Sequence, residues 1–76
     1  MDDTMIIYNR KINVKDFSAM EKGEELIYYK DNNIAYTINR IVDNNNYIVR
    51  KKKIFNNQLV EEKMCKTIGQ LEKIVV

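Results

Sequence analysis

Histidine, proline and tryptophan do not occur in this chain of 76 residues, and cysteine and serine occur once each. Without histidine, nucleophilic catalysis of the Ser-His or Cys-His kind has no general base. A structural zinc site lacks its usual ligands, and the single Cys65 has no partner for an intramolecular disulfide. Glycine occurs only as Gly23 and Gly69, so no glycine-rich phosphate-binding loop is present. We therefore expect no catalytic, cofactor-binding or metal-binding residues.

Pairs of neighbouring acids are the remaining candidates for acid–base chemistry. They are Asp2-Asp3, Glu24-Glu25 and Glu61-Glu62. Neighbours on a strand point to opposite faces, so such pairs do not converge on one site. General acid–base chemistry also needs a desolvating cleft, which a domain of this size hardly provides. The sequence therefore predicts a protein that is not an enzyme.

Long hydrophobic runs are also missing. The longest apolar stretches, Leu26–Tyr29 and Ile74–Val76, are far too short to span a bilayer. The opening "MDDTMIIYNR" begins with acidic residues, which is not typical of a signal peptide. Together with a lone cysteine, these features lead us to expect a cytoplasmic protein without membrane contact.

The net charge of +2 hides a local asymmetry. Residues 1–25 carry four basic and six acidic side chains, whereas residues 50–66 carry six basic and two acidic ones. Basic charge is therefore concentrated in the last third of the chain. A basic patch of this kind is typical of a docking surface for an anionic partner, or of a solvated strand.

Asparagine-rich clusters divide the chain at regular spacing, at residues 30–33, 43–46 and 55–58. Asn and Asp tolerate left-handed backbone, so these clusters predict hairpin turns. The runs around them, "EELIYYK", "IAYTINRIV", "YIVRKKKIF" and "LVEEKMCKTI", are rich in β-branched and aromatic residues. Four strands joined by three tight turns predict an antiparallel meander over residues 23–76.

The simplest turns predict a register for two of the hairpins. A two-residue turn at Asn32-Asn33 pairs Tyr29 with Tyr36, Ile27 with Ile38 and Glu25 with Arg40. A turn at Asn56-Asn57 pairs Lys52 with Glu61, Lys51 with Glu62 and Val49 with Met64, and it places Cys65 opposite Ile48 as a buried apolar residue. Cross-strand pairs of these types stabilise a sheet.

Residues 1–22 form the other part of the single domain that we expect over 1–76. "TMIIYN" and "KINV" are candidate strands around Asn9-Arg10. Val14, Phe17 and Met20 recur at helical spacing, which predicts one short helix over about 14–22 with Asn13 as its N-cap and Gly23 as its C′ residue. At the other end, "TIGQLEKIVV" predicts a tight turn near Gly69 and a closing strand, with a helix over 59–72 as the alternative.

A resemblance to SH3-like barrels of the Tudor type follows from these motifs. Such domains open with a Gly before a charged residue, continue with an apolar-aromatic strand and a short polar turn, and end the second strand in an aliphatic-Asp pair. The matching features are Gly23, Leu26–Tyr29, Asp31–Asn33 and Val42-Asp43, and "TIGQLEKIV" is similar to the segment that closes such barrels. The resemblance spans roughly residues 22–75 and implies a mostly β domain: one small barrel of five to six antiparallel strands with one short helix near 14–22.

The basic run Arg50–Lys53 is the main candidate contact surface. Alternation along a strand sends Arg50 and Lys52 to one face and Lys51 and Lys53 to the other. One interpretation is a protruding hairpin whose lysines discourage edge-to-edge pairing. The other is a ribbon that contacts phosphates, since small barrels bind nucleic acid through basic strands and exposed aromatic rings.

Pairing across the predicted hairpin decides which charges are free. Glu61 and Glu62 would neutralise Lys52 and Lys51, which leaves the remaining cations of this region unpaired. The full set of candidate contacts to a partner or to nucleic acid is Arg50, Lys51, Lys52, Lys53, Lys63, Lys66, Arg40, Tyr28, Tyr36 and Tyr47.

Two functions stay open at this point. The first is a non-enzymatic interaction protein that docks on a larger protein or ribonucleoprotein, for example a phage-encoded or mobile-element-encoded inhibitor of host defence of the anti-CRISPR kind. The second is direct binding of DNA or RNA through the basic hairpin Arg50–Lys53. A homodimer formed through an edge strand, such as the apolar end Ile74–Val76, is a further option.

Overall fold

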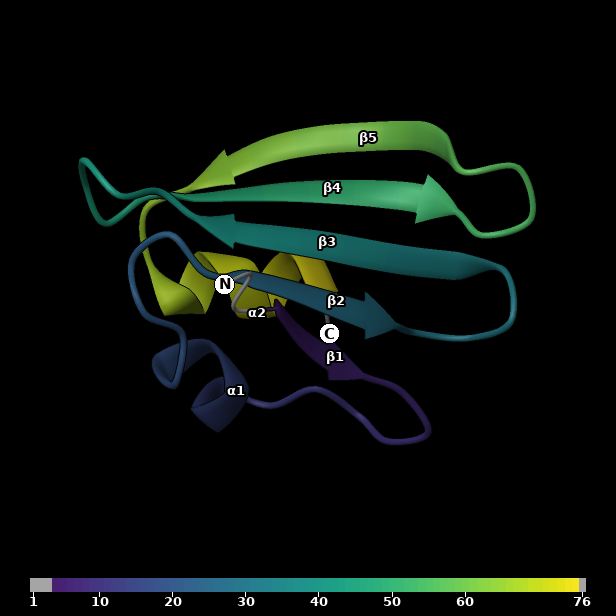
Figure 1. Cartoon of the computed structure of the whole chain (residues 1–76), viewed down its shortest axis with the longest axis horizontal. Coiled ribbons are helices and arrows are strands. Elements are labelled where there is room, and N and C mark those ends of the chain that lie inside the picture. The colour runs from purple at the N-terminus through teal and green to yellow at the C-terminus, as the bar shows by residue number, and fades with distance from the viewer. Residues whose placement is uncertain (1–3, 76) are drawn as a thin grey trace.

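The computed structural model describes residues 4–75 and consists of one five-stranded sheet and two helices (Figure 1). The strands follow each other in the sheet in chain order, β1-β2-β3-β4-β5. Both helices contribute to a core on one face of the sheet, and we call the other side the helix-free face. The elements are β1 (Thr4–Ile7), α1 (Val14–Ser18), β2 (Glu25–Tyr29), β3 (Ile34–Arg40), β4 (Tyr47–Lys53), β5 (Gln58–Cys65) and α2 (Ile68–Val75).

The predicted four-stranded meander is confirmed. Strands β2 to β5 pair in sequence and all three pairings are antiparallel. Each of the Asn-rich clusters lies in one of the three connections. Side-chain oxygens of Asp31, Asn44 and Asn56 accept backbone N–H groups two residues further on, which is the turn chemistry that favours these residue types.

The predicted closed barrel of antiparallel strands is not formed. Within residues 4–75 the sheet is open, with β1 and β5 as its two edges. Strand β1 pairs with β2 in parallel, so the sheet is mixed, and the crossover between these two strands contains α1. The second candidate strand, "KINV", is instead the approach to α1. The barrel lacks its closing strand because the segment that was expected to supply it forms α2.

Helix α2 replaces both predictions for the end of the chain. Strand β5 ends at Cys65, three residues before the end of the predicted run "LVEEKMCKTI". Residues 68–75 are helical and not a closing strand, and the alternative helix over 59–72 begins too early. The Thr67 hydroxyl accepts the N–H of Gln70 at 3.2 Å, and the Gln70 side chain accepts the N–H of Lys66 at 2.7 Å. Thr-x-x-Gln at residues 67–70 is thus close to a capping box, which starts the helix. The apolar end Ile74–Val75 belongs to this helix, so it is no edge strand, and Val76 lies outside the described residues.

Helix α1 begins as predicted and ends earlier. The Asn13 side chain accepts the N–H groups of Lys15 and Asp16, and the Asp16 carboxylate accepts the Asn13 N–H at 2.8 Å, which completes a capping box. The helix ends at Ser18, four residues before the predicted end. The chain then turns so that Gly23, at a φ of 87°, donates its N–H to the Arg40 carbonyl at 2.8 Å. Gly23 is therefore hydrogen-bonded to the last residue of β3 and is not the C′ residue of α1.

The register between β2 and β3 differs from the prediction by one residue. Tyr28 lies opposite Tyr36, Leu26 opposite Ile38, and Glu25 opposite Asn39. The reason is Asp31, whose carboxylate accepts the N–H groups of both Asn33 and Ile34 and forms a loop one residue longer than the predicted turn. A slip of one residue exchanges the two faces of a strand, so different tyrosines become buried.

The register between β4 and β5 is also shifted by one residue. Glu61 lies opposite Lys51 and Glu62 opposite Arg50, and a β-bulge interrupts the ladder between Lys51 and Lys52. Asn57 adopts a φ of 55°, so the turn does use an asparagine in left-handed conformation. Cys65 consequently lies opposite Tyr47 and not Ile48, but it is buried as expected.

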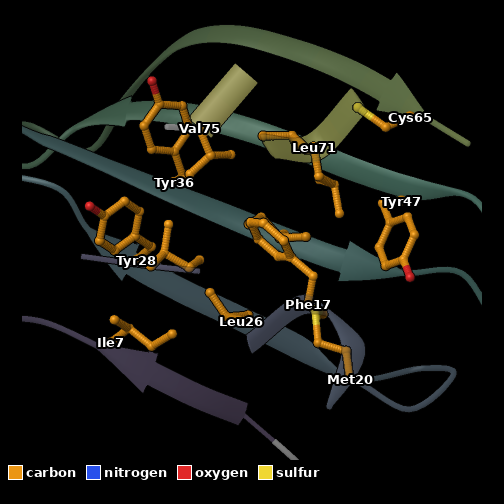
Figure 2. Packing of buried hydrophobic residues seen from close by; sticks show 13 residues of the cluster. Ile7, Phe17, Met20, Leu26, Tyr28, Tyr36, Tyr47, Cys65, Leu71 and Val75 are labelled. Carbon is orange, nitrogen blue, oxygen red and sulfur yellow. The ribbon is translucent and has the colours of Figure 1, made fainter. Parts of the chain in front are cut away.

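The hydrophobic core lies between the helices and one face of the sheet (Figure 2). Phe17 of α1 and Leu71 and Val75 of α2 are fully buried, and they pack into the same cluster as Leu26 and Ile38. The rings of Tyr28 and Tyr36 extend this core, with centroids 6.4 Å apart and planes inclined by 16°. Each side chain of this size contributes roughly 1.5–3 kcal/mol when it leaves water, so the core holds both helices in place.

Candidate functional site

Three of the predicted contact residues, Tyr28, Tyr36 and Tyr47, lie in the core. Their rings are at most 6% exposed, and none of them presents a surface for stacking. Arg40 is half-buried: its guanidinium donates to the Met20 carbonyl and lies 5.9 Å from the centre of the Tyr47 ring. Arg40 therefore connects the end of β3 to the turn after α1, and the three tyrosines belong to the core.

The basic hairpin presents its charges on both faces, as alternation predicts. Arg50 and Lys52 lie on the helix-free face, and Lys51 and Lys53 lie on the side of the helices. The predicted ion pairs are wrong because the register is shifted. Arg50 pairs with Glu62 at 2.9 Å and Lys63 with Glu61 at 3.1 Å. Arg50 and Lys63 were expected to be unpaired, yet they are the neutralised cations.

Across residues 4–75, the lysines at 51, 52, 53 and 66 take part in none of the ion pairs. Lys51 and Lys52 are half-buried, whereas Lys53 and Lys66 are exposed. The hairpin thus carries fewer cations outside ion pairs than the run Arg50–Lys53 suggests. Lys52 and Lys53 lie next to the turn of this hairpin, which carries an almost fully exposed aromatic residue, Phe55, at 89% exposure, whereas Lys66 lies at the opposite end of the hairpin.

Phe55 and two exposed tyrosines are the aromatic residues that the sequence prediction missed. Tyr8 is 62% exposed and Tyr29 is 39% exposed. The sequence did indicate that Phe55 is exposed, because it lies beside the predicted turn Asn56-Asn57 and a side chain at a hairpin tip has little to pack against. For Tyr29 no such signal existed, since the choice between Tyr28 and Tyr29 depends on the register.

The helix-free face of the sheet combines apolar side chains with a polar row. Ile6 and Met64, near opposite edges, are 54% and 61% exposed. Between them the polar row crosses four strands: the Asn39 amide donates to Glu25 at 3.3 Å, and Arg50 reaches both Asn39 and Glu62, at 3.5 and 2.9 Å. Because these polar groups are already paired with each other, covering them leaves few of them unsatisfied.

An open hollow of about 740 Å³ lies at the carboxyl ends of the parallel strands β1 and β2. The loop after β1 and the loop after β2 reach this end of the sheet together, because the crossover through α1 makes the two strands parallel. Asn9, at a φ of 60°, turns the chain out of β1 here. The lining residues are Ile6, Tyr8, Asn9, Arg10, Lys11, Tyr28, Tyr29, Lys30, Asp31, Asn32 and Ile54.

A second, smaller depression of about 280 Å³ adjoins the hollow on the helix-free face. The two share Tyr29 and Ile54, and the smaller one adds Lys52 and Lys53 from the hairpin. Its acid is Glu25, which is bonded to Asn39. Aromatic and aliphatic surface thus lies between lysines of the hairpin and the basic side chains of the hollow.

The charges of the hollow are partly compensated. Arg10 makes two hydrogen bonds to the Asp16 carboxylate, at 2.8 and 3.0 Å, and this pairing lowers the pKa of Asp16 below its ordinary value. The pKa of Asp31 is also lowered, because two backbone N–H groups donate hydrogen bonds to its carboxylate. Of the cations in the hollow, Lys11 and Lys30 take part in none of the ion pairs between residues 4 and 75.

The lowered pKa of Asp16 predicts a pH dependence of stability. A carboxyl whose pKa is lower in the folded state stabilises that state above its unfolded pKa, and this contribution is lost as the pH falls through the folded value. We expect the urea midpoint of the wild type to fall between about pH 5 and pH 2. Asp16→Asn should have a lower midpoint at pH 7 and a shallower decline on acidification. Parallel profiles for the two proteins would contradict this role of the ion pair.

Cys65 is a structural residue. Its thiol is buried and burial raises its pKa, so little reactive thiolate forms at neutral pH. In the part of the chain that the structure describes, no group of three His, Cys, Asp or Glu side chains is placed to hold a metal ion. Of the acid pairs, Asp2-Asp3 lies outside the described residues, and Glu61 and Glu62 point to opposite faces of β5. None of the helices described between residues 4 and 75 is long and apolar enough to cross a membrane.

Comparison of the chain with models of protein families, with curated proteins and with solved structures found no match. The resemblance to SH3-like barrels of the Tudor type therefore gains no support from known proteins. Arguments about function depend on the surface described above.

Proposed function

We propose that this protein is a small binding module, without enzymatic chemistry of its own, that docks on a larger protein or ribonucleoprotein through the helix-free face. The observation that carries the proposal is the exposure of Ile6 and Met64 on a sheet face that no helix covers. An apolar surface crossed by polar groups that are already paired has the composition of a protein interface. A helix-rich or sheet-rich surface of the partner would supply the missing second layer.

Inhibition of a host defence ribonucleoprotein, as an anti-CRISPR protein does, is the biological role that we favour for such a module. A small apolar face with basic residues at one side suits a partner that carries both protein and nucleic acid. The cytoplasm would be the compartment of this activity, in keeping with a lone, buried cysteine.

The test is an affinity capture from lysate with matched variants. Ile6→Lys and Met64→Lys, combined, should remove the captured partner, because two charges would have to be buried against it. Val14→Lys is the control, since Val14 is a similarly exposed apolar residue on α1. Capture that survives the double substitution, or that is lost equally in the control, would contradict docking through this face.

Nucleic-acid binding through the basic hairpin is the second candidate, favoured by the free lysines 51–53 beside the exposed ring of Phe55. Replacing all three lysines with Glu should then abolish the shift of an oligonucleotide in an electrophoretic assay. We expect log K for the unmodified protein to fall with log salt by roughly 0.7 per phosphate contacted on a single strand. Unchanged binding by the triple variant would exclude the hairpin as the contact.

A homodimer remains a prediction and would use β5. This strand is an open edge of the sheet, its residues 58–64 are exposed, and its bulge and charged side chains oppose indiscriminate pairing. Analytical ultracentrifugation checks it: a dimer that dissociates after Val60→Pro, with the fold retained, would support pairing through β5, and a monomer at all concentrations would contradict it.

A further inference from the structure

The hollow at the ends of β1 and β2 contains two exposed aromatic residues, Tyr8 and Tyr29, that neither of the functions proposed above uses. Tyr8 and Tyr29 lie one residue beyond the last paired positions of two neighbouring parallel strands, and both line the hollow. Both rings are well exposed, although a tyrosine normally buries its ring in a core. Two exposed rings that line one hollow offer two aromatic surfaces to a ligand.

Basic side chains line the same two depressions. Lys11 and Lys30 line the hollow, and Lys52 and Lys53 line the depression that adjoins it. The acids of the same surface are Asp31, whose carboxylate bonds two backbone N–H groups, and Glu25, which accepts from Asn39. This surface therefore carries four lysines and two acidic residues, and the carboxylates of both acids are already hydrogen-bonded.

We propose that a single strand of nucleic acid crosses this surface, with bases stacked on Tyr8 and Tyr29 and phosphates at Lys11, Lys30, Lys52 and Lys53. Aromatic rings in a basic groove bind single strands with little sequence preference, because every base has a face that stacks. A duplex hides its bases and cannot use the two rings. The proposal deepens the second function proposed above, nucleic-acid binding, and moves its main contacts from the hairpin to the hollow.

The direct test measures fluorescence anisotropy of a labelled oligothymidine of about 16 nucleotides and of a duplex of equal length. We expect the single strand to bind more tightly than the duplex. Tyr8→Ala with Tyr29→Ala should weaken binding of the single strand roughly tenfold or more, while Tyr8→Phe with Tyr29→Phe should retain it. Lys11→Gln with Lys30→Gln should reduce the salt slope by about 1.4, which corresponds to two phosphates.

Two controls separate the hollow from general charge and from the hairpin tip. Phe55→Ala removes an exposed aromatic ring that lines neither depression, and Lys66→Gln with Lys73→Gln removes two exposed lysines elsewhere. Both variants should bind the single strand within about twofold of the wild type. Circular dichroism checks that every variant is folded.

The outcomes distinguish this inference from the function on which it rests. Binding that is lost in the Tyr8/Tyr29 alanine variant and kept in the phenylalanine variant supports the hollow. Binding that is unchanged in the alanine variant but lost when lysines 51–53 become Glu overturns the hollow and leaves the hairpin. Polyglutamate is an anionic polymer without bases. If it binds as tightly as oligothymidine, or if no oligonucleotide binds, both the proposed role of the hollow and nucleic-acid binding through the hairpin are overturned.

Discussion

Replacing Phe17 with Ala is expected to remove a large share of the free energy of unfolding of this domain. Phe17 is the only buried residue of α1 and has no exposed surface. Truncation of a buried Phe costs about 3–5 kcal/mol, from lost transfer energy and from the cavity that remains. A domain of this length is stabilised by only about 4–11 kcal/mol in total. The free energy of unfolding, measured by urea titration with circular dichroism, should fall by that amount.

A matched control lies next to this residue. Ser18 belongs to the same helix, is exposed, and bonds only the Val14 carbonyl. Ser18→Ala should change the free energy of unfolding by less than about 0.5 kcal/mol. If Phe17→Ala cost no more than Ser18→Ala, the crossover helix would not be part of the core, and the packing described for α1 would be wrong.

The second large effect is expected at Leu71. Leu71 is fully buried among the residues that join α2 to the sheet, and Leu→Ala at such a site costs about 2–5 kcal/mol. The change also tests the secondary structure. In a helix the buried positions recur at three or four residues, as Ile68, Leu71 and Val75 do, whereas a strand would bury position 73 as well.

Glu72 and Lys73 supply the comparison for Leu71. Both are exposed on α2, so Glu72→Ala and Lys73→Ala should leave the urea midpoint nearly unchanged. A loss of stability in Lys73→Ala as large as that in Leu71→Ala would indicate that both positions are buried, as they would be in a strand, and would contradict the helix. Far-ultraviolet circular dichroism of the wild type provides an independent measure of helix content.

The sheet edge formed by β5 bears on both proposals. A β-bulge opposite Lys51 and Lys52 increases the local twist of this edge, and its side chains of both signs pair within the hairpin. Such an edge is protected against indiscriminate strand addition. The helix-free face and the hollow, by contrast, present exposed rings and aliphatic groups without a covering layer. These surfaces, and not the edge, are the ones on which both proposals rest.

Local chemistry explains the elements that could be predicted. The strands β2 to β5 follow from β-branched and aromatic runs between Asn-rich turns, and the start of α1 follows from the Asn13 cap. The start of α2 was also encoded locally, by Thr67 and Gln70, but the apolar run after them is equally compatible with a strand. Short apolar segments remain ambiguous until something decides what they pack against.

Candidate contact residues were harder to predict, because contact depends on the register. Asp31 bonds two N–H groups and so lengthens a loop by one residue, and that single residue puts Tyr28 in the core and Tyr29 on the surface. The same kind of shift pairs Arg50 with Glu62 across the hairpin and leaves Lys51 and Lys52 outside the ion pairs, while Lys63 pairs with Glu61 within β5. Sequence identifies the residue types, whereas pairing across strands selects the exposed ones.

What this sequence determined by itself is the absence of a histidine-dependent site and of a disulfide, the order of four antiparallel strands, and the position of one helix cap. Those properties follow from composition and from bonds between residues a few positions apart. Only the tertiary structure decided that β1 lies parallel to β2, that α2 packs on the sheet instead of closing it, and that Tyr8 and Tyr29 meet at one hollow. These features depend on contacts between distant segments, because burial of the shared core, and not local preference, selects among the conformations that each segment can adopt.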